Sequence, residues 1–182
     1  MAAGCVPVTK YNLESGKSAQ QVKFEVVENA GVFSLENKST KTMGCDKFPD
    51  TDENRRGCIV AEARTMLAVS VKLSGSGGWY FSKFQICSVD TPQKPDDFDD
   101  CSLTDVERAD WLVLAHNGIA MPGADGRVDI AGFGTGLRQF TLLDYNWTRG
   151  LYFYRVQVCP NESSGESDCL WSDPAVENRG WG

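Results

Sequence analysis

Histidine is almost missing from this sequence of 182 residues, which has a single one, His116, beside an Asn-Gly turn. A serine or cysteine hydrolase relay needs a histidine as its base, and no G-x-S-x-G element accompanies this one. One histidine and no C-x-x-C pair also argue against the usual zinc sites. The sequence therefore predicts a protein that is not an enzyme.

Long apolar runs and basic clusters are missing as well. No run approaches the roughly 18 residues that a membrane-spanning helix needs. The net charge is −7 and no basic patch is present, so we expect neither a nucleic acid nor an anionic membrane surface as partner. The N-terminus lacks a basic segment followed by an apolar one, so we expect no signal peptide. Length predicts a single domain over residues 1–182, with 1–20 as a loose lead-in.

Six of the seven cysteines fall into neighbouring pairs, and each pair brackets a polar, turn-rich loop. The pairs are Cys45 with Cys58, Cys87 with Cys101, and Cys159 with Cys169. A disulfide that closes such a loop contributes about 2–4 kcal/mol, so we expect three sequential disulfides, with reduced buried thiols as the alternative. Disulfides favour an extracytoplasmic location, whereas a native start at Met1 favours the cytoplasm.

Apolar and polar residues alternate along much of the chain, which predicts short β-strands with one buried face. In the run 67–73 the apolar face is Leu67, Val69, Val71 and Leu73. In the run 151–158 it is Tyr152, Tyr154, Val156 and Val158, opposite Arg155 and Gln157. In the run 79–87 strict alternation places Tyr80, Phe84 and Ile86 on one face, with Trp79, Phe81, Lys83 and Gln85 on the other.

The order of strands and turns predicts the fold class. We expect the run 67–73 to pair antiparallel with the run 79–87, and the run 137–143 to form an antiparallel hairpin with the run 151–158. Thr104 and Glu107 have the spacing of a capping box, which predicts a short helix. Many short strands, strong turn signals and few helical turns predict an all-β antiparallel sandwich with long disulfide-clipped loops.

Two loops carry candidate binding residues. The acidic run contains Asp96, Asp97, Asp99 and Asp100, and it could hold Ca²⁺ together with backbone carbonyls; the alternative is a solvated acidic loop. We expect no other cofactor. Tyr145 and Trp147 lie in the turn between two predicted strands, where exposed aromatic rings could stack on sugars or dock on a partner. The alternative is an aromatic tip folded back over the sandwich end.

The C-terminal region has a recognisable pattern. Its elements are Phe140-x-Leu-x-Asp144-x-Asn146, a Tyr-rich strand ending at Val158, and Ser172-Asp173-Pro174-x-x-x-Asn178. This pattern resembles the DP-EP family and the related bacterial inclusion-body-protein family, although Arg179-Gly180 follows where the second half of the family's name motif would stand. The resemblance implies an immunoglobulin-like β-sandwich with no established enzymatic activity.

These observations predict a non-enzymatic β-sandwich that acts by self-association, forming a homo-oligomer, or by binding another macromolecule. The alternative is a secreted carbohydrate-binding or toxin-like module that contacts a glycan through Tyr145 and Trp147.

Overall fold

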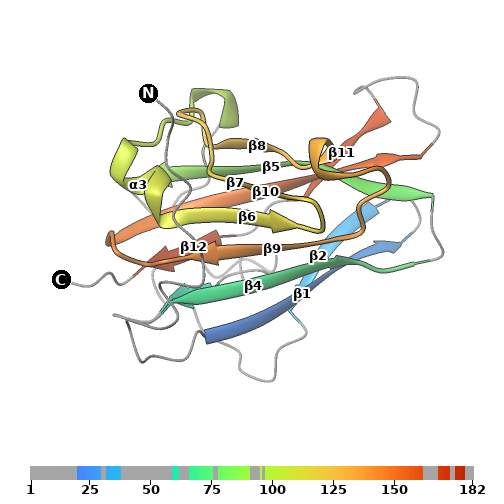
Figure 1. Ribbon diagram of the computed structural model, residues 1–182, viewed down its shortest axis with the longest axis horizontal. Coiled ribbons are helices and arrows are strands. Elements are labelled where there is room, and N and C mark those ends of the chain that lie inside the picture. The colour runs from blue at the N-terminus through green and yellow to red at the C-terminus, as the bar shows by residue number, and fades with distance from the viewer. Residues whose placement is uncertain are drawn as a thin grey trace.

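The structure is a computed structural model, and two β-sheets stacked face to face form its body (Figure 1). The residues that it describes are 20–29, 32–37, 59–61, 66–75, 78–90, 95, 97–161, 168–172 and 175–178. The all-β sandwich predicted from the sequence is confirmed. In the described part of the chain, no helix is long and apolar enough to cross a membrane.

The first sheet has six strands in the order β2-β1-β4-β9-β6-β7. Their bounds are β1 (Gln20–Asn29), β2 (Val32–Asn37), β4 (Leu67–Leu73), β6 (Trp111–Ala115), β7 (Gly118–Ala120) and β9 (Gln139–Asp144). Neighbours pair antiparallel except β1 and β4, which are parallel. β7 therefore forms one edge of this sheet.

The second sheet has the order β3-β12-β10-β5-β8, and β11 also pairs with β10. Its strands are β3 (Ile59–Ala61), β5 (Trp79–Val89), β8 (Arg127–Asp129), β10 (Gly150–Pro160), β11 (Leu170–Ser172) and β12 (Ala175–Asn178). β12 and β3 are parallel, and the other pairs are antiparallel. In the described ranges, three short helices lie in connections: η1 (Phe98–Asp100), α3 (Asp105–Asp110) and η2 (Ala131–Phe133).

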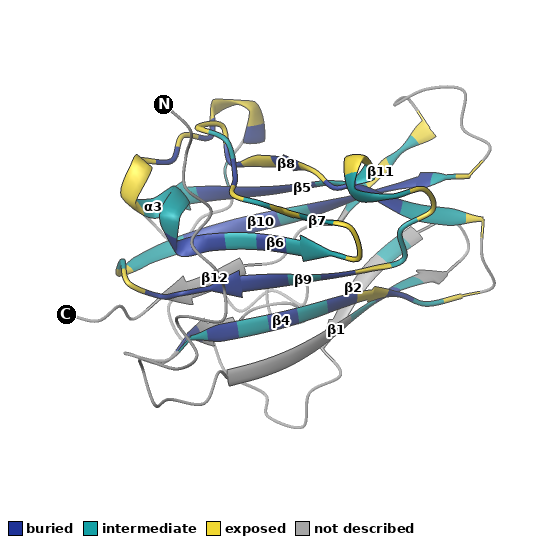
Figure 2. Ribbon diagram, in the orientation of Figure 1, coloured by how far each residue is buried: buried dark blue, intermediate teal, exposed yellow. Residues whose placement is uncertain are grey.

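The predicted buried faces meet between the sheets (Figure 2). The β4 face of Leu67, Val69, Val71 and Leu73 is buried, as is the β10 face of Tyr152, Tyr154, Val156 and Val158. Phe140 of the first sheet lies edge-on to Phe81 and Phe84 of the second, with ring centroids 5.1 and 6.2 Å apart. These aromatic contacts join the two layers at the centre of the core.

The strict alternation predicted for the run 79–87 is wrong at Phe81. The register of β5 against β10 shifts there: Gln157 pairs with Lys83, but the next residue, Val158, pairs with Phe81. Ser82 is the extra residue of this β-bulge, which changes the alternation of faces. Phe81 consequently joins Phe84 in the core instead of facing outward.

Both predicted strand pairings between neighbouring runs are also wrong. β4 pairs with β1 and β9, whereas β5 pairs with β10 and β8. β9 belongs to the first sheet and β10 to the second, so the segment between them crosses the end of the sandwich (Figure 1). Alternation shows that each strand has one apolar face, but it does not show whether the next strand lies beside it or opposite it.

The outer face of β10 was predicted to be polar, and much of it is covered. Phe153 on this face packs with Phe98, Cys87 and Cys101 in a second small apolar cluster. Gln157, also on this face, is buried. The cover comes in part from the connection after β5, which the Cys87–Cys101 disulfide ties down to the sheet.

Candidate functional site

Tyr145 and Trp147, in the β9–β10 connection, differ in their exposure to solvent. Their rings are stacked, with centroids 4.9 Å apart and planes 15° from parallel. Tyr145 is only 4% exposed, whereas Trp147 is 38% exposed. The prediction that both rings form a contact surface is therefore corrected: Trp147 reaches the solvent and Tyr145 supports it from within.

A buried carboxylate outside the loop holds this arrangement. Asp110, at the end of α3, accepts hydrogen bonds from the backbone N–H of Trp147 (3.1 Å) and of Thr148 (2.8 Å). Its backbone carbonyl accepts the N–H of Tyr145 at 2.8 Å. Burial raises the pKa of Asp110, and the charge of Glu107 raises it further, against the lowering effect of the bonds from Thr148 and Trp147.

Two more polar residues fix the start of the connection. Asn146 has a left-handed backbone with φ 54°, a conformation that asparagine adopts more readily than most residues. Its N–H donates to Asp144 Oδ1 at 2.8 Å, and its side-chain amide donates to the carbonyl of Ala61 at 3.4 Å. Both residues are fully buried. The Asp144-x-Asn146 part of the C-terminal pattern thus shapes the turn that orients Trp147.

The described residues of the acidic run have different surroundings. Asp97 caps η1, since its Oδ1 accepts the N–H of Asp99 at 2.8 Å. Asp99 forms ion pairs with Arg127 of β8 and with Arg155 of β10, the second at 3.6 Å. Asp100 is exposed, and Asp96 lies outside the described residues. Within the described ranges, no group of three or more His, Cys, Asp or Glu side chains could hold a metal ion.

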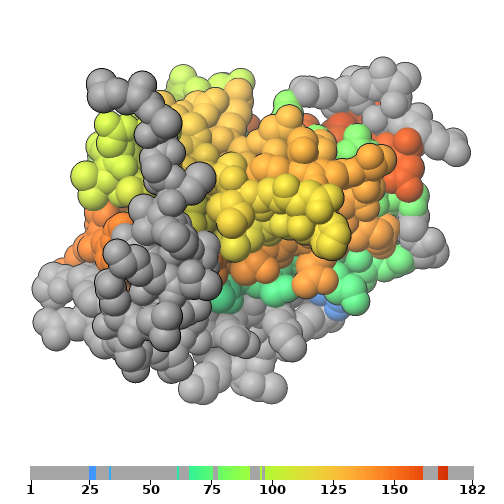
Figure 3. Space-filling view, in the orientation of Figure 1, coloured from blue at the N-terminus to red at the C-terminus, as the bar shows by residue number. Residues whose placement is uncertain are grey.

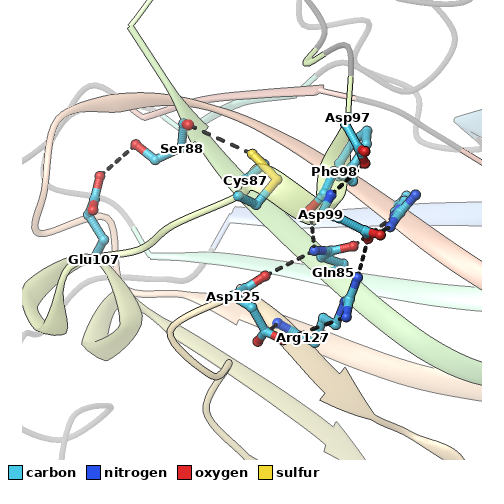
Figure 4. Close-up of a disulfide and its surroundings, with 11 residues drawn as sticks. Gln85, Cys87, Ser88, Asp97, Phe98, Asp99, Glu107, Asp125 and Arg127 are labelled. Atoms are coloured by element: carbon cyan, nitrogen blue, oxygen red, sulfur yellow. Dashed lines mark hydrogen bonds and ion pairs between the residues drawn. A yellow bond between two sulfur atoms is a disulfide. The ribbon is translucent and has the colours of Figure 1, made fainter.

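Gln85 and Arg155 fasten this loop to the second sheet. Figure 4 shows Gln85 between Phe98 and Asp125. The Gln85 amide is fully buried and donates to the carbonyls of Phe98 (2.8 Å) and Asp125 (2.9 Å). Its oxygen accepts Arg155 Nε at 2.8 Å. The Arg155 guanidinium lies 4.4 Å from the Phe98 ring centroid and 4.0 Å from that of Trp171. The sequence gives no sign of these partners because they come from four separate segments.

Two of the three predicted disulfides are confirmed. Cys87 is bonded to Cys101, with Cα atoms 5.1 Å apart, and Cys159 is bonded to Cys169, with Cα atoms 4.2 Å apart. Each closes one of the predicted polar loops. The predicted Cys45–Cys58 pair lies outside the described residues.

The β7 edge is a surface feature that the sequence reasoning missed. Among the described residues, β7 pairs with β6 alone, and the two strands are joined by the turn His116-Asn117. Ile119 is 59% exposed and Met121, just beyond the strand, is 46% exposed. The space-filling view shows the β6–β7 hairpin on the surface of the molecule (Figure 3). An apolar edge strand was not recognisable from three residues without the sheet order.

Comparison with known proteins gives a limited result. No protein-family model matches the chain, and no curated protein matches it. Among solved structures it is similar to the McoA multicopper oxidase of the hyperthermophile Aquifex aeolicus, with 10% identity and a TM-score of 0.35 over 96% of this chain. The match spans only 32% of the length of that oxidase. It is also similar to reduced rusticyanin, with 12% identity and a TM-score of 0.32, over 94% of this chain and 97% of that one.

Proposed function

We propose that this protein is a non-enzymatic β-sandwich that acts by self-association, with two copies pairing through strand β7. The observation that carries the proposal is an uncharged, exposed sheet edge. Such an edge presents unpaired backbone groups that another strand can bind, which is why many proteins block their edges with charges or cover.

The hairpin geometry identifies the free backbone groups. Ala115 and Gly118 flank the two-residue turn, so they form the hydrogen-bonded pair that closes it. The next pair, Leu114 with Ile119, is then a non-hydrogen-bonded pair. The N–H and C=O of Ile119 consequently point away from β6, toward any strand that approaches the edge.

The side chains of β7 differ from those of β8, the edge strand of the other sheet. β8 has exposed Arg127 and Asp129, and charges of this kind discourage strand addition. β7 has only Gly118, Ile119 and Ala120, followed by Met121. Of these two edges, only β7 therefore lacks a charged side chain.

A second copy of the chain is the partner that fits this edge. Two chains of net charge −7 repel each other, so a shared surface without charged side chains minimises the repulsion. A two-fold axis beside Ile119 would pair each Ile119 with that of the other copy, with two backbone hydrogen bonds and adjoining apolar side chains.

Size-exclusion chromatography with light scattering over a range of protein concentrations tests this proposal. We expect the wild type to shift from monomer to dimer as concentration rises, and Ile119→Lys to remain monomeric. Val106→Lys is the matched control, because Val106 is 64% exposed but lies on α3, and it should dimerise like the wild type. A wild type that stays monomeric at all concentrations would contradict the proposal, and a dimer that disappears with reductant would be a disulfide-linked one instead.

A second candidate is a secreted carbohydrate-binding or toxin-like module, which the exposure and support of Trp147 favour. A ring held at a fixed position by a stacked Tyr145 loses little freedom when a sugar packs against its exposed surface. Screening on a glycan array checks this candidate: binding that Trp147→Ala abolishes and Leu170→Ala leaves intact would support it. Leu170 is similarly exposed, at 40%, but lies on β11.

The resemblance to the DP-EP and bacterial inclusion-body-protein families supports the non-enzymatic part of the proposal, and with it we propose an immunoglobulin-like type of sandwich. Phe140 and Leu142 of the shared pattern lie in the core, and Asp144 and Asn146 hold the β9–β10 connection. These roles are structural.

A further inference from the structure

Two buried polar groups lie at the end of the core next to α3. Trp111 and Tyr152 are fully buried, and their rings meet edge to face with centroids 5.3 Å apart. In the part of the chain that the structure describes, neither the Trp111 Nε1–H nor the Tyr152 hydroxyl has a hydrogen-bond partner. Folded proteins seldom leave such groups unpaired, and internal water is a common partner.

Three carboxylates lie near enough to Tyr152 for their charges to act on its hydroxyl. The side chain folds back over Gly150, where an added Cβ would come within 2.9 Å of the hydroxyl oxygen. The hydroxyl thus points toward the beginning of β10. Burial raises the pKa of Tyr152 far above its usual value, and the charges of Glu107, Asp110 and Asp144 raise it further. The hydroxyl therefore keeps its proton and needs an acceptor.

Trp111 brings a second donor to the same end of the core. It lies directly opposite Asp144 in the pairing of β6 with β9, and opposite residues place their side chains on the same face of a sheet. Asp144 is fully buried beside it, and Asp110 precedes it in the chain. The α3-end cluster, by which we mean Glu107, Asp110, Trp111, Asp144 and Tyr152, thus combines two N–H or O–H donors with three carboxylates.

We propose that the α3-end cluster binds an ordered water molecule, which accepts hydrogen bonds from Trp111 Nε1–H and Tyr152 O–H and donates its hydrogens to the carboxylates of Asp110 and Asp144. A cation would meet the two donor hydrogens, and an anion would meet three carboxylates. Water accepts two hydrogen bonds and donates two, so it satisfies both sets. A carboxylate oxygen that accepts one backbone N–H has a further lone pair for this bond.

This site would connect four elements. The water would join β6, β9 and β10 to α3. Asp110 also holds the N–H groups of Trp147 and Thr148, so the water would help to fix the carboxylate that positions the exposed Trp147 ring.

Urea unfolding of Tyr152→Phe gives the first test, since this change removes only the hydroxyl. Removing a hydroxyl that is hydrogen-bonded to bound water lowers the free energy of unfolding, so the urea midpoint should fall while the slope stays the same. A hydroxyl without any partner is removed at no cost, so an unchanged or raised midpoint would overturn the proposal. Tyr80→Phe at a half-buried position of β5 is the matched control and should leave the midpoint unchanged.

NMR spectroscopy of the same variants provides the second test. The indole N–H signal of Trp111 is assigned by its loss in Trp111→Phe. In the wild type, this N–H should show a cross-peak to long-lived bound water. The cross-peak should weaken in Tyr152→Phe. Absence of the cross-peak in the wild type would overturn the proposal whatever the urea result. A urea midpoint that changes on addition of a chelator would also overturn it, because the bound species would then be a cation.

Discussion

The backbone N–H of Thr148 donates to the Asp110 carboxylate at 2.8 Å, across the boundary between α3 and the β9–β10 connection. The N–H of Trp147 donates to the other carboxylate oxygen at 3.1 Å. One buried acid at the end of a six-residue helix thus fixes the segment that crosses from one sheet to the other. The position of the Trp147 ring depends on it.

Replacing Asp110 by alanine should therefore loosen this segment. Two backbone N–H groups lose their acceptor, which destabilises the fold, while removal of the buried carboxylate offsets part of this loss. We expect the free energy of unfolding to fall by about 1–3 kcal/mol. Urea unfolding measures the change. Asp105→Ala on the same helix is the control: its side chain is 97% exposed and pairs only with Arg108 at the surface, so its loss should be small. Equal losses in both variants would mean that Asp110 does not anchor the connection.

The pH dependence of stability should show the burial of Asp110. Its folded-state pKa lies above the ordinary value of 3.8, chiefly because of burial, so the folded protein binds a proton more strongly than the unfolded chain. The stability that this stronger proton binding contributes is present in full below the ordinary pKa, and it is lost as pH rises through the folded-state pKa. Relative to Asp110→Asn, the wild type should become more stable as pH is lowered through that window.

Glu107 provides a control of opposite sign for the pH experiment. Burial opposes its ionisation, but hydrogen bonds from Ser88 and Thr104 outweigh this effect and lower its pKa below 4.5. The contribution of ionised Glu107 to stability is present above that value and is lost as pH falls through the folded-state pKa. Relative to Glu107→Gln, the wild type should lose stability on acidification. Urea midpoints measured for all three proteins across the acid range would contradict the assignment if both variants changed in the same direction.

Local features of this fold could be predicted from the sequence. The period of two in β4 placed its buried face correctly, and the Thr104–Glu107 spacing located α3 with its capping box. The Cys87–Cys101 and Cys159–Cys169 disulfides followed from the polar loops that they close. Each of these signals lies within one short segment, where the side-chain period and turn residues determine the result.

Features that depend on distant segments could not be predicted. The bulge at Ser82 reversed the face of Phe81, and nothing in the alternating pattern marks the extra residue. The run 96–100 contains no basic residue, but sheet formation brings Arg127 and Arg155 to Asp99. The anchoring role of Asp110 has no signal in the sequence, because its partners follow more than thirty residues later, at separations of 37 and 38.

Arg155→Lys tests whether the covering loop depends on a planar cation. Lysine keeps the charge, but it cannot lie flat between the Phe98 and Trp171 rings while it also donates to Gln85. We expect the free energy of unfolding to fall by about 2 kcal/mol. The cation–π contacts become weaker, and the buried amide oxygen of Gln85 loses its donor. Urea unfolding should show it, and exposed Arg149→Lys should have no effect. An unchanged midpoint for Arg155→Lys would indicate that charge alone holds the loop.

Gly126 is the position where a single added methyl group should do most harm. Its backbone has φ 72°, and a Cβ there would overlap the carbonyl oxygen of Ile86 in β5, a backbone atom held within the sheet.

Gly136 has nearly the same conformation, with φ 65°, but an added Cβ would meet nothing within 4 Å. Gly136→Ala therefore measures the cost of the left-handed backbone alone, about 1–2 kcal/mol. Gly126→Ala adds the overlap, so we expect it to lose about 3 kcal/mol or more. Urea unfolding of the two variants separates these causes: equal losses would mean that β5 yields easily at Ile86, and a much larger loss at Gly126 would mean that the Gly123–Gly126 turn is packed too closely against β5 to accept a side chain.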